Sequence, residues 1–69
     1  MKEFKCDVIK DIGTISTDGN YTKSVKLISF NDAAPKIDIR TWCGTMMLKG
    51  IALTRDEAKR LAEILNKEL

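Results

Sequence analysis

The sequence has no histidine, one proline, one tryptophan and only two cysteines among its 69 residues. Without histidine, a Cys–His nucleophilic pair cannot form. A zinc site needs about four ligands, usually in close pairs, so Cys6 and Cys43 do not provide one. A disulfide between them stays open, although reduced thiols fit a chain without an export signal better. We therefore expect no cofactor and no metal ion.

Long apolar runs are also missing. None approaches the roughly eighteen residues of a membrane span, and the start MKEFKCDVIK has acidic residues and no apolar centre, unlike a secretory signal. We therefore expect a cytoplasmic protein that does not contact membranes.

Charge of neither sign dominates, since the net charge is +2. The composition, 43% hydrophobic and 32% charged, is typical of one soluble domain spanning residues 1–69. So small a core usually needs a staple or a partner subunit, which favours self-association.

The stretch 54–69 predicts an amphipathic helix. Thr54 and Glu57 form the capping box T-x-x-E at its start. Its acidic and basic residues balance, so we expect its outer face to be solvated rather than to bind an anionic partner. Apolar residues then recur at spacings of three and four, as on one face of a helix: Ala58, Leu61, Ala62, Leu65 and Leu69, with Ile64 beside them.

Upstream of this helix, β-branched residues and turn signals alternate. Gly19-Asn20 is a two-residue hairpin loop, NDAAP (31–35) is a longer connection that ends in proline, and CGTMM (43–47) is punctuated by Gly44. The pattern predicts an α+β fold with the order β-β-β-β-α, in which a four-stranded antiparallel sheet precedes one C-terminal helix. The expected strands are residues 4–17, 21–30, 36–42 and 48–53.

Side-chain alternation divides such a sheet into two faces. We expect Phe30 opposite Lys36 in the second hairpin and Ile12 opposite Leu27 in the first. The resulting apolar face would be covered by the helix. It would hold Phe4, Cys6, Val8, Ile12, Val25, Leu27, Ile37 and Ile39.

The other face is basic and aromatic, and one helix cannot cover both faces of a sheet. Bases of single-stranded nucleic acid stack on aromatic rings while Lys and Arg hold the phosphates. This face has the residue types for that chemistry. A dimer interface anchored by Trp42 is the alternative interpretation. The face would hold Lys26, Ile28, Phe30, Lys36, Asp38, Arg40 and Trp42, with Ile9 and Ile15 beside them.

Residues 37–40, Ile-Asp-Ile-Arg, run toward Trp42, and residues 49–53, Lys-Gly-Ile-Ala-Leu, lead into the last helix. These two motifs resemble the positive cofactor four family of transcriptional coactivators, and most of all its small bacterial YdbC-like branch. The resemblance covers about residues 21–69. It implies a curved four-stranded sheet and a helix, joined as a homodimer. It also implies that single-stranded DNA, or melted duplex, is held along the sheet.

The resemblance assigns roles to three residues: Arg40 contacts a phosphate or a base edge, Trp42 stacks on a base, and Lys49 contacts a phosphate. The face assignment adds Lys26, Phe30 and Lys36 to the nucleic-acid-binding residues. We expect the Trp42 ring to be partly exposed in the free protein. Asp38 should be structural and pair with Arg40 or Lys36.

We therefore predict a homodimeric single-stranded DNA-binding protein with little sequence preference and a role in transcription, replication or repair. RNA is an alternative ligand. The alternative function is a protein-interaction module of a transcription or repair assembly, whose free sheet face docks a protein. An enzyme with a small-molecule substrate is not expected. The paired carboxylates Asp56 and Glu57 lie in the first turn of the helix, where acids favour the helix dipole.

Overall fold

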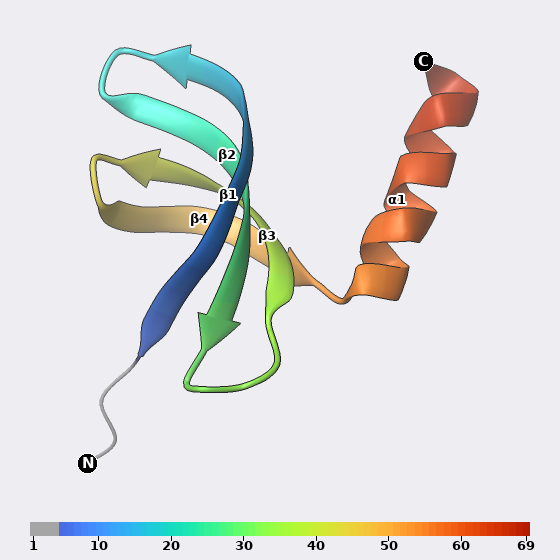
Figure 1. Ribbon diagram of the computed structural model, residues 1–69. Coiled ribbons are helices and arrows are strands. Elements are labelled where there is room, and N and C mark those ends of the chain that lie inside the picture. Colours follow the sequence, from blue (N-terminus) through green and yellow to red (C-terminus); the bar gives the residue numbers. More distant parts are fainter. Residues whose placement is uncertain (1–4) are drawn as a thin grey trace.

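The computed structural model describes residues 5–69. Its four strands, β1 (Cys6–Asp18), β2 (Tyr21–Phe30), β3 (Lys36–Cys43) and β4 (Met46–Leu53), form one antiparallel sheet in the order β1-β2-β3-β4. The sheet is curved, and the helix α1 (Arg55–Glu68) follows it (Figure 1). This arrangement confirms the predicted α+β fold. Phe4, which the sequence assigned to the core, lies outside the described residues.

Glycines with positive φ make the two tight hairpin turns. Gly19 has φ of 61° in the β1–β2 turn, and Gly44 has φ of 60° in the β3–β4 turn. This backbone region favours glycine because it has no Cβ. The second turn is tighter than predicted, so β4 begins at Met46 rather than at Leu48.

The β2–β3 connection is hydrogen-bonded to Lys5, the residue before β1. Asn31 and Asp32 both have positive φ, which these two residue types tolerate better than most. The Asn31 N–H donates to the Lys5 carbonyl at 2.7 Å, and the Asn31 side-chain oxygen accepts from the Lys5 N–H at 2.8 Å. Asp32 adds an exposed ion pair with Lys5 at 3.1 Å. This loop therefore fixes the start of β1 beside the end of β2.

The register of β2 against β3 differs by two residues from the prediction. Ile28, not Phe30, lies opposite Lys36, and Lys26 lies opposite Asp38. Because side chains repeat every two residues along a strand, this shift leaves each side chain on its predicted face. The division of β2 and β3 into two faces is therefore as predicted, although the pairing is not.

β1 pairs with β2 through three irregularities of register, and at each one an isoleucine has no partner. The unpaired residues are Ile9, Ile12 and Ile15. Such bulges bend a strand and increase its twist. Lys10 rather than Ile12 lies opposite Leu27, so the predicted pairing of the first hairpin is wrong.

The bulges also change the face on which the start of β1 lies. Cys6 lies opposite Phe30, and Val8 lies opposite Ile28. Cys6 and Val8 therefore share the face of Ile28 rather than that of Leu27, which corrects the prediction. A prediction that counts regular pairs back from the turn cannot give this result, because each unpaired residue moves the residues before it to the other face of the sheet.

The core lies on the face that was predicted to be free. Ile28 and Asp38 are fully buried, and Trp42 is nearly so. Because α1 stands away from the sheet (Figure 1), the curvature of the sheet itself buries these residues. We call this side, which carries Ser24, Ile28, Asp38 and Trp42, the inner face, and the opposite side, which carries Val25, Leu27, Ile37 and Ile39, the outer face.

The helix begins as predicted but does not cover the sheet. The Glu57 N–H donates to Thr54 Oγ1 at 3.2 Å, and the Thr54 N–H donates to Glu57 Oε1 at 2.8 Å, which completes the capping box. No residue of α1 is buried, and α1 has only a few contacts, with β3 and β4. Only Thr54 separates β4 from α1, and α1 extends away from the sheet rather than over its outer face (Figure 1). The predicted helix cover is therefore wrong.

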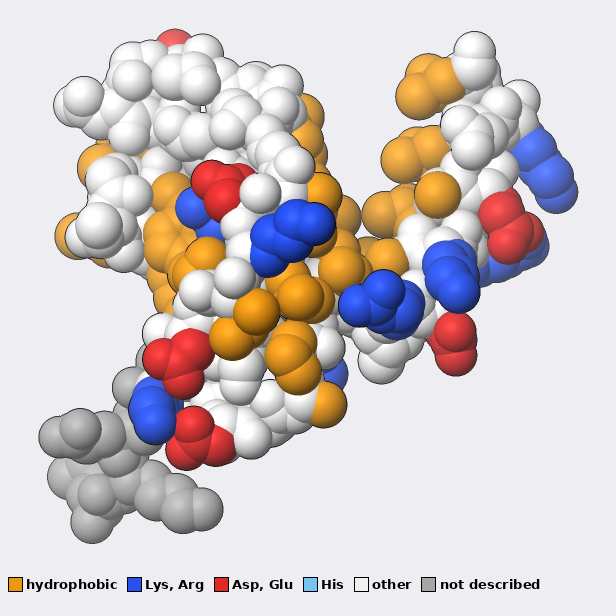
Figure 2. Space-filling model, in the orientation of Figure 1, with side chains coloured by type: hydrophobic (Ala, Val, Ile, Leu, Met, Phe, Trp, Pro, Cys, Tyr) orange, Lys and Arg blue, Asp and Glu red, His pale blue; other side chains and the backbone are white. Residues whose placement is uncertain are grey.

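Hydrophobic side chains line the side of α1 that faces the sheet (Figure 2). Ile64 and Leu65 are 50% and 45% exposed. The apolar stripe of α1 is thus left without a covering layer in the single chain. Within residues 5–69, no helix is long and apolar enough to cross a membrane.

Candidate nucleic-acid interface

Five of the six residues predicted to bind nucleic acid lie on the inner face. Strand alternation brings them together from two neighbouring strands: Lys26 and Phe30 on β2, and Lys36, Arg40 and Trp42 on β3. Two cation–aromatic contacts link four of them. The Lys26 ammonium lies 5.0 Å from the centre of a Trp42 ring, and the Arg40 guanidinium lies 5.8 Å from the centre of the Phe30 ring. The fifth, Lys36, is exposed at the start of β3, opposite Ile28.

The sixth predicted residue, Lys49, is separated from the others. It is exposed on β4. Its neighbour Gly50 lies opposite Arg40, so strand alternation directs Lys49 to the outer side of the sheet. Lys49 can therefore contact only a ligand that passes over β4.

A buried carboxylate holds Arg40 in place. Arg40 Nε donates to Asp38 Oδ2 and Arg40 Nη2 donates to Asp38 Oδ1, both at 2.6 Å. Arg40 Nη1 donates to the Leu48 carbonyl at 3.1 Å. The hydrogen bonds to Asp38 raise the pKa of Arg40 above its ordinary value. One N–H on each terminal nitrogen is left for a ligand, while Asp38 has the predicted structural role.

Glycine at position 50 allows β4 to lie against β3 where the Arg40 side chain crosses. A Cβ atom on Gly50 would meet Arg40 Cβ and would lie 2.6 Å from the Ile39 carbonyl oxygen. Side chains do not tolerate such approaches, so the backbone would have to move. Gly50 thus supports the position of Arg40 over the Leu48 carbonyl.

Trp42 is less accessible than predicted. Only 8% of the residue is exposed, so the prediction of a partly exposed ring is wrong. The curved sheet surrounds the ring, and Lys26 lies over it. Among residues 5–69, the buried Trp42 Nε1–H has no hydrogen-bond acceptor. A buried unpaired donor costs about 1–3 kcal/mol, and an oxygen atom of a ligand would remove that cost.

Lys26 has an exchangeable partner. Its ammonium lies 3.5 Å from Asp11 Oδ2, and the two side chains are 20% and 60% exposed. Ion pairs that water reaches contribute at most about 1 kcal/mol, so a phosphate can compete with Asp11. The sequence did not identify Asp11, because only the bulges of β1 bring it opposite Lys26.

Cys6 lies at the edge of the same face, opposite Phe30. Burial raises the pKa of the Cys6 thiol above its ordinary value, and the nearby charge of Asp38 adds to this effect. A thiol of raised pKa is a poor nucleophile. In the part of the chain that the structure describes, no group of three or more His, Cys, Asp and Glu residues could hold a metal ion.

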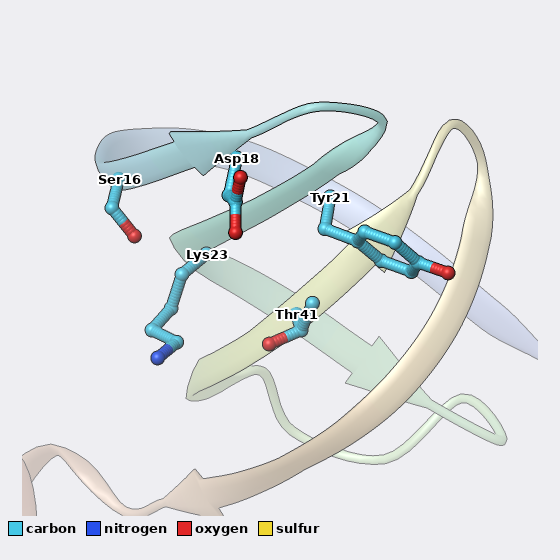
Figure 3. Close-up of a pocket in the computed structure, with 5 residues that line it drawn as sticks. All are labelled: Ser16, Asp18, Tyr21, Lys23 and Thr41. Atoms are coloured by element: carbon cyan, nitrogen blue, oxygen red, sulfur yellow. The ribbon is translucent and has the colours of Figure 1, made fainter.

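A second group of polar residues, which the sequence did not identify, surrounds a hollow of about 230 Å³ (Figure 3). The hollow lies on the outer side, at the end of the sheet that carries the two hairpin turns. Three strands contribute to it. The β2–β3 register, which differs from the prediction, places Thr41 opposite Lys23, while Ser16 and Asp18 pair regularly with β2 beside the turn. It is lined by Ser16, Asp18, Tyr21, Lys23 and Thr41.

Sequence comparison identifies a bacterial relative of the chain. No family model matches the chain. An uncharacterized protein of Treponema pallidum (strain Nichols) is 40% identical over 67 residues, which span 93% of this chain and 79% of that protein. The chain belongs to the family of this Treponema pallidum protein.

A second similarity is partial. The alpha-1,6-mannosyl-glycoprotein 2-beta-N-acetylglucosaminyltransferase of Sus scrofa is 39% identical over 59 residues. The match spans 86% of this chain but only 11% of that enzyme. It therefore concerns a small segment of a much longer protein.

Proposed function

We propose that the protein binds single-stranded DNA on the inner face of its sheet. The observation that carries this proposal is the buried Trp42 Nε1–H, which lacks an acceptor while the Lys26 ammonium lies over the same residue. An unpaired donor and a cation attract an oxygen that carries negative charge, and phosphate supplies one. The resemblance to the positive cofactor four family supports the same ligand.

Binding on this face requires an exchange over the Trp42 ring. Lys26 leaves the ring and its partner Asp11 and contacts a phosphate, and a base takes its place over the indole. Stacking of a base on an aromatic side chain contributes about 1–3 kcal/mol and tolerates any base. Arg40 offers its two remaining N–H groups at the next position, beside Phe30. This mechanism gives little sequence preference on the inner face.

The exposed lysines extend the cationic surface. Lys36 lies at the start of β3, where it can meet the backbone of the same strand of DNA. Lys49 meets the DNA only where the strand passes over β4. Binding of this kind serves transcription, replication or repair. We place it in the cytoplasm, which keeps thiols such as Cys6 reduced.

Binding can be tested with variants of Lys26. Labelled oligo-dT, a duplex and the matching RNA are titrated with the protein, and fluorescence anisotropy gives each affinity. We expect oligo-dT to bind more tightly than duplex, and Lys26→Gln to weaken oligo-dT binding several-fold. Lys59→Gln removes the same charge from α1 and should leave the affinity unchanged. Equal losses in the two variants, or no binding of any strand, would reject the inner face as the site; tighter RNA binding would make RNA the ligand.

The same proposal includes a homodimer, and the apolar side of α1 supports it. A helix of 14 residues is only marginally stable in water unless another surface packs against it. Between β4 and α1 lies a groove of about 400 Å³, whose walls include Ile51, Leu61 and Ile64. Its remaining lining residues are Leu53, Glu57 and Arg60.

A second copy of the chain fits this groove by charge as well as by apolar character. In a two-fold interface the same surface is used twice, so Glu57 of each copy can face Arg60 of the other. The apolar walls then cover one another. Burying half of a large aliphatic side chain contributes about 1 kcal/mol, and each copy supplies several such residues.

Sedimentation at micromolar concentration tests the dimer. We expect a species of twice 7.8 kDa. Ile64→Asp places a charge in the groove and should dissociate the dimer, whereas Lys59→Asp, on the opposite side of α1, should not. A folded monomer of the unmodified chain at this concentration would refute the dimer.

A further inference from the structure

The hollow on the outer side gathers polar groups that have no partners in the chain. Among residues 5–69, the side chains of Ser16, Asp18, Lys23 and Thr41 make no hydrogen bond or ion pair. Figure 3 shows the Asp18 carboxylate and the Thr41 hydroxyl directed toward the space between the strands. Unpaired groups that converge on a concavity are characteristic of ligand sites.

An aromatic ring completes the hollow. Tyr21 is 53% exposed, and its ring lies beside Thr41 with the hydroxyl directed away from the other four residues (Figure 3). An exposed ring next to the Asp18 carboxylate and the Lys23 ammonium offers a planar ligand both stacking and hydrogen bonds. The volume of about 230 Å³ is below the range of roughly 300–1,000 Å³ that holds drug-sized molecules. It therefore suits one base rather than a larger compound.

We infer that this hollow binds a guanine base of the bound single strand, with Asp18 and Lys23 reading its edge and Tyr21 stacking on its plane. A carboxylate only accepts hydrogen bonds, and an ammonium only donates them. Guanine has two adjacent donors, N1–H and the N2 amino group, for Asp18. It also has two adjacent acceptors, O6 and N7, for Lys23, and lysine is a common partner of that acceptor pair.

The other bases fit this pair of charges less well. Thymine has no amino group and would place a carbonyl oxygen near the carboxylate. Cytosine and adenine each offer one amino group. Neither has, as guanine has, a pair of adjacent donors next to a pair of adjacent acceptors. The hollow thus gives guanine an advantage that the Trp42 ring, which stacks on any base, does not give.

This inference rests on the proposed binding of single-stranded DNA. Thr41 precedes Trp42 on β3, and Lys23 lies opposite Thr41 on β2. The hollow and the Trp42 site are therefore on opposite sides of the same end of the sheet. A strand that leaves Trp42 reaches the hollow by passing the hairpin turns at that end.

The test compares two labelled strands of about twelve nucleotides, within the usual site sizes of such proteins. One is all thymidine, and the other has a single guanine near its centre, which avoids guanine-rich structures. Anisotropy should show about five- to tenfold tighter binding of the guanine strand, as a well-placed pair of hydrogen bonds to a base gives. Inosine in place of guanosine lacks the N2 amino group and should lose most of this gain.

Variants assign the gain to the hollow. Asp18→Ala should bring the ratio of the two affinities close to one. Asp7→Ala, which removes an equal charge near the other end of β1, should leave the ratio unchanged. Tyr21→Phe should also keep it, because the hydroxyl points away. Equal affinity for the two strands, or a ratio that Asp18→Ala does not change, would overturn the guanine site while oligo-dT binding still stands. Failure of both strands to bind would reject the proposed function and the guanine site together.

Discussion

Replacing Asp38 with alanine should remove a large part of the stability of the fold. Asp38 is fully buried and accepts two hydrogen bonds of 2.6 Å from Arg40. Removing one partner of a buried ion pair costs about 3–5 kcal/mol, because the other charge stays without compensation. The Arg40 side chain is 15% exposed, so some water reaches it, and we expect a loss of about 3 kcal/mol. The total stability of a domain of this length is only roughly 3–10 kcal/mol.

Urea unfolding followed by the emission of Trp42, the single tryptophan, measures this loss. With a slope of about 1 kcal/mol per molar urea, the midpoint should fall by about 3 M. Arg40→Met should cost at least as much, since it leaves the fully buried carboxylate unpaired. The double variant with Asp38→Leu and Arg40→Met should lose much less than the two single losses added, because an apolar pair can replace a buried ion pair.

The reasoning fails if Asp38→Ala costs less than about 1 kcal/mol. The ion pair would then behave like one on the surface, and the inner face would not be the core of the fold. Additive losses in the double variant would also contradict the account, because they would show that the two side chains do not depend on each other.

Three further changes test other parts of the structure. Gly50→Ala should destabilise the fold by several kcal/mol in urea unfolding because its Cβ would collide with β3, whereas Gly13→Ala, which has nothing within 4 Å, should change stability by less than about 1 kcal/mol. Thr54→Ala removes the helix cap and should cost about 1 kcal/mol, seen as lost helical signal in circular dichroism. Because burial raises the pKa of Cys6, its alkylation should accelerate at a higher pH than that of a free thiol. The stability that this shift contributes should be complete below the ordinary thiol pKa and disappear as pH rises through the raised value.

Local signals in the sequence predicted the elements well. The capping box at Thr54 fixed the start of α1, because it depends on two residues of one turn. The hairpin signal at Gly19 and the connection at residues 31–35 gave the bounds of β2. The faces of β2 and β3 also followed from alternation, since a register error of two residues does not change a face.

Features that depend on three-dimensional packing were not predictable in this way. Three isoleucines, Ile9, Ile12 and Ile15, fit a regular strand as well as they fit bulges, so the sequence did not show the change of face at Cys6. The choice of core face depended on the curvature of the sheet, which buries Trp42 without help from the helix. The hollow depended on the β2–β3 register, which differs by two residues from the prediction and places Thr41 opposite Lys23.

The central claim is that the inner face binds single-stranded nucleic acid through Trp42 and the surrounding cations, and a titration with oligo-dT at several salt concentrations tests it most directly. The emission of Trp42 reports on the site without a label. If about four to six phosphates are neutralised, the logarithm of the binding constant should fall with the logarithm of salt concentration with a slope of roughly −3 to −4, and the emission should be quenched in step with binding. A flat salt response, or an unchanged emission at saturating oligo-dT, would contradict the account.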